Sequence, residues 1–319
     1  MRMAFVLGVM RRSGTNYLHD LLSSHPACSA AAIPEDFFVS ELEQLDWYGE
    51  RVARHWNPSW WNGEPRAAIR VELGRAVARL AVEGTDEPVD PSPGEAALRL
   101  VKTPSVSGLR HLRGFFPTVP VVFIVRDGRA VVESGIRSFG WWNFDVATSI
   151  WAAAVDEILT FLDRDADTGL SMMVRYEDMV ADTKGEMERL LRFLGLSVED
   201  YPFAAAEALP VRGSSELAAE GVEALHWKGV ARHTDFSPLG RFQDWSSARH
   251  ARFNHLAGHQ SRALGYTLVE RPMSGWSAAA YNGAKDLRRW LSRRAWRQRL
   301  ARLVPHPGPP GPDREIGTL

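Results

Sequence analysis

The chain has 319 residues, of which 45% are hydrophobic and 24% are charged, and its formal net charge is -1. This length and apolar content suffice to bury a sizeable core, which excludes the disordered and fibrous classes of protein. The near-neutral charge gives no whole-protein reason to expect nucleic acid as a partner, so any anion site has to be local. The single cysteine, Cys28, excludes CxxC metal or redox motifs and is expected to be a buried residue in a reducing compartment.

The first predicted element is a buried strand at residues 4–9, where apolar residues follow one another without alternation. This run of about six apolar residues is too short for a signal peptide and is interrupted by Arg11 and Arg12. No stretch of the sequence reaches the roughly 18 apolar residues of a membrane-spanning helix, so a cytoplasmic location is expected. Apolar residues at helical spacing then predict a helix over residues 17–22, which a His-Pro pair ends.

Two further strand-helix units follow along the chain. Residues 121–125 form an apolar run, and residues 126–129 open a helix that continues to Ile136. Residues 171–176 predict a third strand, which is followed by an amphipathic helix over residues 184–194. This alternation predicts an α/β fold in which a central parallel sheet carries helices on both faces.

We expect residues 1–284 to form a single domain. Within it, residues 40–65 are rich in tryptophan and are expected to form an acceptor or lid segment, while residues 83–95 have the composition of a surface loop. Residues 285–319 are expected to form a basic helix and a disordered tail rich in proline and glycine. The tryptophans of that helix either pack on the body of the protein or contact a membrane surface or an acidic partner.

The loop after the first predicted strand has the composition of an anion site. A helix N-terminus that follows a buried strand presents unpaired backbone N–H groups and the positive end of the helix dipole. Gly14 permits close approach, Ser13, Thr15 and Asn16 add donors, and Arg12 adds charge. The lysine of a Walker A loop is missing, so the loop lacks the standard arrangement for Mg²⁺-assisted phosphoryl transfer. A plain structural turn is the alternative.

Residues 12–18, Arg-Ser-Gly-Thr-Asn-Tyr-Leu, closely resemble the 5′-phosphosulfate loop of sulfotransferases that use 3′-phosphoadenosine-5′-phosphosulfate (PAPS). In that family the basic residue before Ser-Gly-Thr binds the sulfate-bearing phosphate, and this residue is Arg12 here. The resemblance implies a P-loop-like three-layer fold, PAPS as the donor, adenosine 3′,5′-bisphosphate (PAP) as the product, and no required metal. The donor-binding residues that it implies in this loop are Arg11, Arg12, Ser13, Gly14, Thr15, Asn16 and Tyr17.

Arg126 at the end of the second predicted strand and Ser134 eight positions later resemble the family's 3′-phosphate motif. Side chains at the carboxyl ends of strands reach the crevice where open α/β sheets bind ligands, and a guanidinium holds a phosphate through two parallel hydrogen bonds. The alternative is that Arg126 forms a salt bridge with Asp127 or with another neighbouring residue. Tyr17 and Tyr176 match family positions that contact adenine, and either also fits a core tyrosine.

Residues 237–242 resemble a glycine-arginine-tryptophan segment of bacterial members of the family. The resemblance implies that Gly240 and Arg241 contact the 3′-phosphate side of the nucleotide, although Phe242 replaces the usual tryptophan. The four motifs, at residues 12–18, at 126–134, at Tyr176 and at 237–242, occur in the family's order. The resemblance spans roughly residues 4–266, and the motifs together are far more specific than any one of them.

Lys102, in Val-Lys-Thr-Pro, resembles the lysine that acts at the reacting group in this family. Cytosolic members carry their histidine base two positions later, but this chain has Pro104 there. Carbohydrate, tyrosyl-protein and bacterial glycolipid enzymes use a glutamate shortly after the first helix, and Glu35 resembles it. The resemblance therefore implies Glu35 as general base, with Lys102 and Arg12 facing the charge that develops on the leaving group. The alternatives are Asp36, Glu41 and a merely solvated acid.

The predicted function is transfer of a sulfuryl group from PAPS to a hydroxyl or amine of a small-molecule, glycan or lipid acceptor, by an enzyme of bacterial type. The aromatic residues of the segment 40–65 and the Trp141-Trp142 pair suit sugar rings or lipophilic scaffolds. Two alternatives stay open: a non-catalytic nucleotide- or glycan-binding module on the same fold, and a Mg²⁺-dependent P-loop kinase. The sequence leaves the oligomeric state open.

Overall fold

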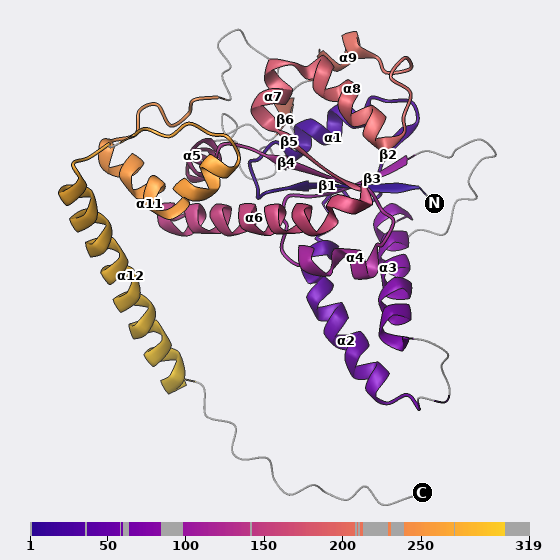
Figure 1. Ribbon diagram of the computed structural model, residues 1–319, viewed down its shortest axis with the longest axis horizontal. Coiled ribbons are helices and arrows are strands. Elements are labelled where there is room, and N and C mark those ends of the chain that lie inside the picture. The colour runs from indigo at the N-terminus through magenta and orange to yellow at the C-terminus, as the bar shows by residue number, and fades with distance from the viewer. Residues whose placement is uncertain are drawn as a thin grey trace, which may run out of the picture. The chain divides into compact units, whose positions relative to one another are not determined.

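A five-stranded parallel sheet with strand order β2-β3-β1-β4-β5 forms the centre of the computed structural model (Figure 1). Every residue of β1 and β4 is buried, which is the environment that their unbroken apolar runs predict. The strands are β1 (Met3–Gly8), β2 (Cys28–Ala30), β3 (Leu98–Thr103), β4 (Val121–Val125) and β5 (Ser171–Arg175). The structure describes residues 2–35, 37–57, 59, 64–83, 98–140, 142–207, 209, 211–212, 229–230, 239–270 and 272–303.

Helices cover both faces of this sheet, so the predicted three-layer α/β fold is confirmed. A short antiparallel pair, β6 (Val211–Arg212) and β7 (Gly229–Val230), lies outside the main sheet. The α-helices are α1 (Thr15–Ser23), α2 (Leu42–Arg54), α3 (Pro65–Glu83), α4 (Leu112–Phe115), α5 (Gly128–Ser138), α6 (Phe144–Asp165), α7 (Tyr176–Ala181), α8 (Thr183–Leu194), α9 (Phe203–Glu207), α11 (Ser247–Ala263) and α12 (Gly275–Leu303). The 3-10 helices are η1 (Phe38–Glu41), η3 (Leu109–His111) and η4 (Ala166–Thr168).

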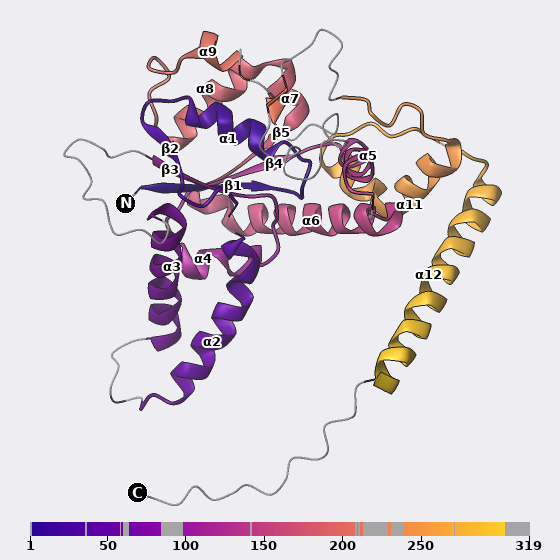
Figure 2. The ribbon, with the colours of Figure 1, turned by 180° about the vertical axis from the view of Figure 1, so that it is seen from behind.

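The two faces of the sheet have separate cores because side chains alternate along each strand. Ala4 and Val6 of β1 pack with α1, α7 and α8, which Figures 1 and 2 show on one side of the sheet. On the other side Phe5 meets Phe116 edge-on at 4.9 Å between ring centroids, and Phe123 meets Phe161 of α6 at 5.6 Å. Each fully buried side chain of this size stabilises the fold by about 1.5–3 kcal/mol.

Some element boundaries differ from the prediction for identifiable reasons. Tyr176 was predicted to end a strand, but β5 ends at Arg175 and Tyr176 opens α7. The basic helix was predicted from residue 285, yet α12 already begins at Gly275 because the alanines after Trp276 are strong helix formers.

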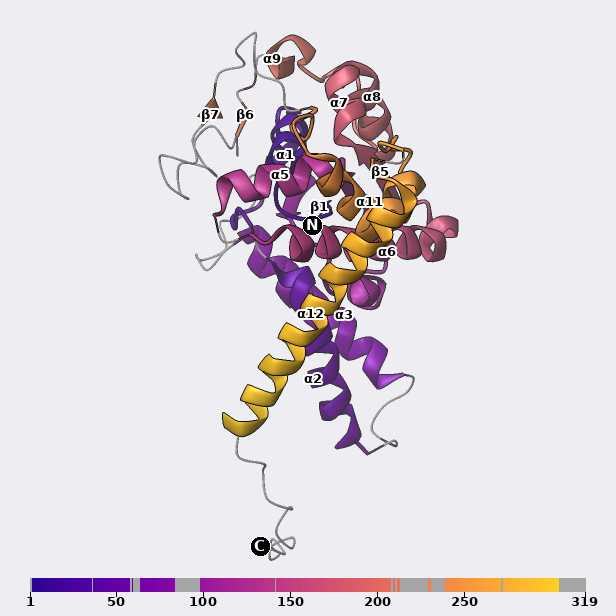
Figure 3. The same ribbon diagram turned by 90° about the vertical axis from the view of Figure 1, so that its left-hand side faces the viewer.

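Figure 3 shows α2 and α3 side by side, and an ion pair between Asp46 and Arg70 joins them.

The described residues divide into two compact units, Met1–Trp245 with Leu256–Leu268, and Ser246–His255 with Val269–Leu319. Within the second unit the buried guanidinium of Arg252 forms an ion pair with Asp286 of α12 at 2.7 Å. These units group the residues differently from the predicted boundary after residue 284, which stays a prediction. None of the described helices has both the length and the apolar character that crossing a membrane requires.

Candidate active site

The loop between β1 and α1 lies at the edge of the sheet where parallel strands end, and two of its residues adopt left-handed backbone conformations. Arg12 has φ 76° and Gly14 has φ 96°. A Cβ atom added to Gly14 would lie 2.4 Å from Cδ2 of Tyr176, so only glycine fits there. Gly8 is restricted in the same way, since its added Cβ would lie 2.2 Å from Oγ1 of Thr15.

Hydroxyl groups hold this loop in shape from the inside. The fully buried Ser13 donates its hydroxyl proton to the backbone carbonyl of Met10 at 2.7 Å, and its Oγ lies 3.3 Å from Oγ1 of Thr15. The first turn of α1 contains no acidic residue that would occupy the positive end of the helix. The loop therefore presents the backbone N–H groups of a helix N-terminus to an anion.

Three arginines lie together beside this loop, and two of them bind the hydroxyl of Ser134, which is buried in α5. Nε of Arg12 donates to Ser134 Oγ at 3.1 Å, and Nη1 of Arg241 donates to the same oxygen at 3.4 Å. Nη1 of Arg126 donates to the backbone carbonyl of Arg12 at 2.9 Å. The structure thus brings together four residues that the sequence placed in three separate motifs. We call Arg12, Arg126, Arg241 and Ser134 the arginine cluster.

The arginine cluster concentrates positive charge in a buried place, where the guanidinium groups repel one another. Desolvation by burial is the largest effect on Arg12, and the neighbouring charges of Arg126 and Arg241 add to it, so that the pKa of Arg12 falls to about 9. Arg12 still carries its charge at neutral pH. An anion with several charges, such as a phosphate, relieves this repulsion on binding.

Lys102 at the end of β3 connects the loop to the predicted base. Its Nζ donates a hydrogen bond to Oδ1 of Asn16 and lies 3.4 Å from Oε1 of Glu35. The Lys102 side chain is 6% exposed and that of Glu35 is 20% exposed, so the carboxylate has more access to an incoming molecule than the ammonium. Of the alternative bases, Glu41 is exposed on η1, and Asp36 lies outside the described residues.

The two predicted adenine-contacting tyrosines lie in the hydrophobic core. Tyr17 and Tyr176 are each 5% exposed and meet edge-on at 5.8 Å between ring centroids. The guanidinium of Arg126 lies 4.5 Å from the centre of the Tyr176 ring, so this tyrosine positions the arginine cluster. These contacts support the core-tyrosine alternative, and an adenine contact stays a prediction.

Around the cluster, neighbouring polar groups are paired in a way that was not predicted. Asp127 caps α5 and forms a buried ion pair with Arg129 at 2.6 Å. Glu177 accepts hydrogen bonds from the backbone N–H of Asp127 at 3.0 Å and from the hydroxyl of Tyr266 at 2.8 Å. These contacts fix the backbone from which the Arg126 side chain extends. Gly240, the remaining predicted residue, has φ 72° and precedes Arg241.

A pocket of about 450 Å³ is lined by residues that follow Glu35 and Lys102 in the sequence, namely Phe37 and Pro104. Its walls come from the residues after β1, from Phe37, from the residues after β3 and from α6. Arg11 belongs to this pocket rather than to the arginine cluster, and its guanidinium lies 5.7 Å from the centre of the Phe37 ring. Sequence reasoning missed the wall from α6, because no local pattern marks it. The residues that define the pocket's character are Arg11, Phe37, Pro104, Trp142, Ile150 and Glu157.

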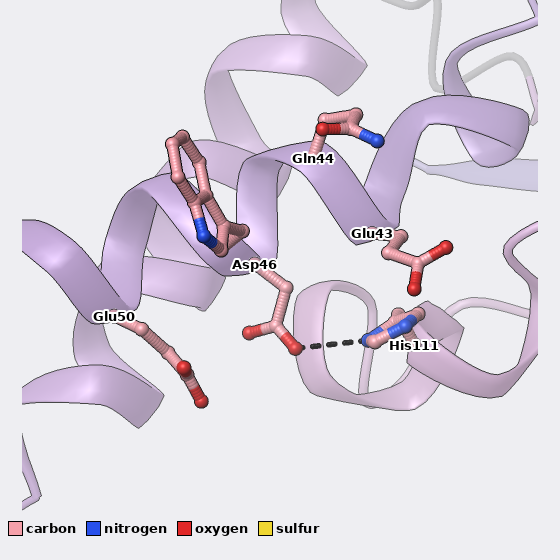
Figure 4. Close-up of a pocket in the computed structure, with 6 residues that line it drawn as sticks. Glu43, Gln44, Asp46, Glu50 and His111 are labelled. Atoms are coloured by element: carbon pink, nitrogen blue, oxygen red, sulfur yellow. Dashed lines mark hydrogen bonds and ion pairs between the residues drawn. The ribbon is translucent and has the colours of Figure 1, made fainter. Parts of the chain in front are cut away.

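A second pocket, of about 360 Å³, lies on α2 within the predicted acceptor segment (Figure 4). Glu43, Asp46 and Glu50 line it, and Figure 4 shows Asp46 joined to His111, at 2.9 Å. Arginines of this chain pair with all three acids, so the acids serve the packing of α2 against its neighbours. Trp47 is half-exposed here, while Trp60, Trp61 and Trp141 lie outside the described residues.

Comparison with known proteins identifies a family for this chain. The sequence model described as "Sulfotransferase family" matches residues 4–200. The protein-tyrosine sulfotransferase of Drosophila melanogaster is 27% identical over 210 residues, which cover 61% of this chain and 38% of the relative. Protein-tyrosine sulfotransferase A of Caenorhabditis elegans is 23% identical over 202 residues, which cover 61% of this chain and 50% of the relative. The chain thus spans no more than half the length of these curated relatives.

Among solved structures, a sulfotransferase domain from the curacin biosynthetic pathway is similar at 17% sequence identity and a TM-score of 0.46, covering 84% of this chain and 99% of that chain. The family match covers more than half of the chain, and its span includes the loop between β1 and α1, Glu35, Lys102, Arg126 and Ser134. The chain therefore belongs to the sulfotransferase family.

Proposed function

We propose that this protein transfers a sulfuryl group from PAPS to a hydroxyl or amine acceptor, with Glu35 as the general base. The observation that carries the proposal is the position of Lys102, which contacts both Asn16 of the phosphate loop and the carboxylate of Glu35. A donor phosphate on the loop and an acceptor proton on Glu35 are thereby brought to the two sides of one ammonium group.

The residues of the arginine cluster and the loop have the chemistry to hold the donor. The loop N–H groups and Arg12 suit the 5′-phosphosulfate, and Arg126, Ser134 and Arg241 suit the 3′-phosphate. When bound, the donor supplies an activated sulfuryl group. Donor binding without a metal is part of the proposal, since the cluster itself supplies the positive charge.

In the proposed reaction the acceptor oxygen or nitrogen forms a bond to sulfur while the bond from sulfur to the bridging phosphate oxygen breaks. Glu35 takes the acceptor proton, and the bond electrons remain on the phosphate of PAP. Lys102 and Arg12 stabilise the negative charge that develops on that oxygen. Membership of the carbohydrate- and tyrosyl-protein-like branch of the family is part of the proposal, because the resemblance implies a glutamate base in that branch.

The proposed acceptor site is the pocket lined by Phe37, two residues after Glu35, and by Pro104, two residues after Lys102. Its walls combine apolar and aromatic side chains, including Phe37, Trp142 and Ile150, with two charges, Arg11 and Glu157. Such a lining suits a small molecule, a glycan ring or a lipid headgroup with an apolar neighbour. The tyrosyl-protein relatives make a tyrosine side chain the second acceptor to test.

A transfer assay with ³⁵S-labelled PAPS tests the proposal. Phenols, monosaccharides, lipid alcohols and a tyrosine-containing peptide serve as acceptors, and EDTA is present throughout. We expect labelled product with wild type, loss of transfer in Glu35→Gln, and wild-type transfer in Glu72→Gln, whose carboxylate is exposed on α3. Loss in Glu41→Gln instead would move the base to η1.

The same assay, together with calorimetric titration of PAP in EDTA, separates the two alternative functions. A non-catalytic binding module would bind PAP but give no labelled product with any acceptor. A P-loop kinase would require Mg²⁺ and ATP and would not bind PAP in EDTA. Either result would overturn the proposed function.

A further inference from the structure

Helix α12 carries an exposed apolar stripe that the sulfotransferase chemistry does not use. Trp276 and Leu287 are 91% and 58% exposed, and Leu291 is 52% exposed. Ala280 and Gly283 lie between them at intervals of three or four residues, so these side chains share one face of the helix. A Cβ atom added to Gly283 would meet nothing within 4 Å, which shows that this face is open along its middle.

A different face of α12 packs within its own compact unit. Asn282 is buried, and both Asn282 and Asp286 bind the guanidinium of Arg252 on α11. Asp286 also bonds to His255 at 2.9 Å. Since these residues lie well to one side of the stripe on the helix, the stripe does not serve this packing.

The charge of α12 selects the partner. The helix contains eight basic residues and one acidic residue, and that acid, Asp286, is paired with Arg252. Arg288, next to Leu287, is exposed beside the stripe, and Lys285 is exposed on the opposite side of the helix. A strongly basic helix with an exposed tryptophan and exposed leucines on one face fits the boundary between lipid headgroups and acyl chains.

We propose that α12 binds flat on an anionic lipid surface, with Trp276, Leu287 and Leu291 inserted and Arg288 beside the headgroups. A second copy of the chain fits the stripe less well, because Ala280 and Gly283 leave the middle of the seam without large side chains to pack. This inference concerns a separate surface and does not depend on the proposed function.

Vesicle flotation of the full chain tests the inference. We expect the wild type to float with vesicles that contain about one third phosphatidylglycerol and to float much less with phosphatidylcholine alone. Trp276→Ser with Leu287→Ser should weaken binding by about tenfold or more, since it removes the inserted side chains. Arg288→Gln should weaken binding by about fivefold, and only on the anionic vesicles. The matched control is Trp47→Ser, which removes an exposed tryptophan from α2 and should bind like wild type.

Three results would overturn the inference. The first is no flotation of the wild type with anionic vesicles, and the second is equal flotation of the wild type and the stripe variant. The third is a dimer of the wild type, seen by light scattering, that the stripe variant dissociates, because the stripe would then bind a second copy. Circular dichroism of each variant confirms that α12 still folds.

Discussion

The ammonium nitrogen of Lys102 lies 3.4 Å from a carboxylate oxygen of Glu35, and the same ammonium group holds Asn16 of the phosphate loop. This contact joins the end of β3 to the segment after β2 and to the first turn of α1. A buried lysine with a carboxylate on one side and an anion-binding loop on the other can stabilise a leaving phosphate while the carboxylate takes a proton. The relationship generates the first prediction.

Glu35→Gln should lower kcat by about a hundredfold to ten-thousandfold, the usual contribution of a positioned general base. The dissociation constant for PAP should change by less than about threefold, because the glutamine side chain still fills the site and the arginine cluster is intact. Steady-state kinetics and calorimetry measure the two quantities. An unchanged kcat, or a loss of PAP binding as large as the loss of kcat, would contradict the role of Glu35.

The affinity for PAP should fall at alkaline pH because Arg12 loses its charge there. Burial and the charges of Arg126 and Arg241 lower the pKa of Arg12 to about 9 in the free protein. A bound anion favours charged Arg12, so affinity should be constant from about pH 7 to 8 and should fall as pH rises through about 9. Calorimetry across this range gives the profile. In Arg12→Gln the affinity should be weaker and should show a smaller fall, and an identical profile in both proteins would assign the titration to another group.

Gly14→Ala should destabilise the protein by about 2 kcal/mol or more and should abolish PAP binding. The residue has φ 96°, and the new Cβ atom would lie 2.4 Å from the Tyr176 ring. Urea denaturation gives the free energy of unfolding. The matched control is Gly140→Ala, where the added Cβ meets nothing within 4 Å, and its free energy of unfolding should stay within about 0.5 kcal/mol of wild type. Equal effects of both substitutions would show that the loop geometry is unimportant.

Cys28 should be unreactive in the native protein. Desolvation by burial raises the pKa of its thiol to about 11, so little thiolate is present at pH 8. Because it is the only cysteine, the reaction with a chromogenic disulfide reports on this site alone. We expect the native protein to react about a hundredfold more slowly than the urea-unfolded protein. Equal rates would mean that the start of β2 opens readily.

The sequence was most informative where chemistry depends on residues close together in the chain. The strand-loop-helix order around Gly14 follows from an apolar run and a helical pattern that local forces largely decide. The positions of Arg126 after β4 and of Ser134 in α5 also follow from a strand end and the next helix, while their role at the 3′-phosphate stays a prediction from the family resemblance. Glu35 and Lys102 are 67 positions apart, and only the family resemblance paired them before the structure did.

Other features require tertiary structure. The acceptor pocket combines residues after β1, residues after β3 and one side of α6, and nothing in any of these segments alone marks a pocket. Arg11 and Arg12 are neighbours in the sequence, yet the left-handed backbone at Arg12 helps direct one guanidinium toward Phe37 and the other toward Ser134. The burial of Tyr176 could not be predicted from local sequence either, since its contact with Tyr17 depends on how α7 packs on α1.

The most direct test of the central claim is calorimetric titration of the protein with PAP in the presence of EDTA, comparing wild type, Arg126→Ala and the exposed control Arg192→Ala. The account predicts micromolar metal-free binding by wild type and Arg192→Ala. Arg126→Ala should lose about 2 kcal/mol of binding free energy, which is about a thirtyfold weaker affinity, because a buried charged hydrogen-bond donor is removed. No binding of PAP by the wild type, or binding of ATP only with Mg²⁺, would contradict the assignment of PAPS as the donor.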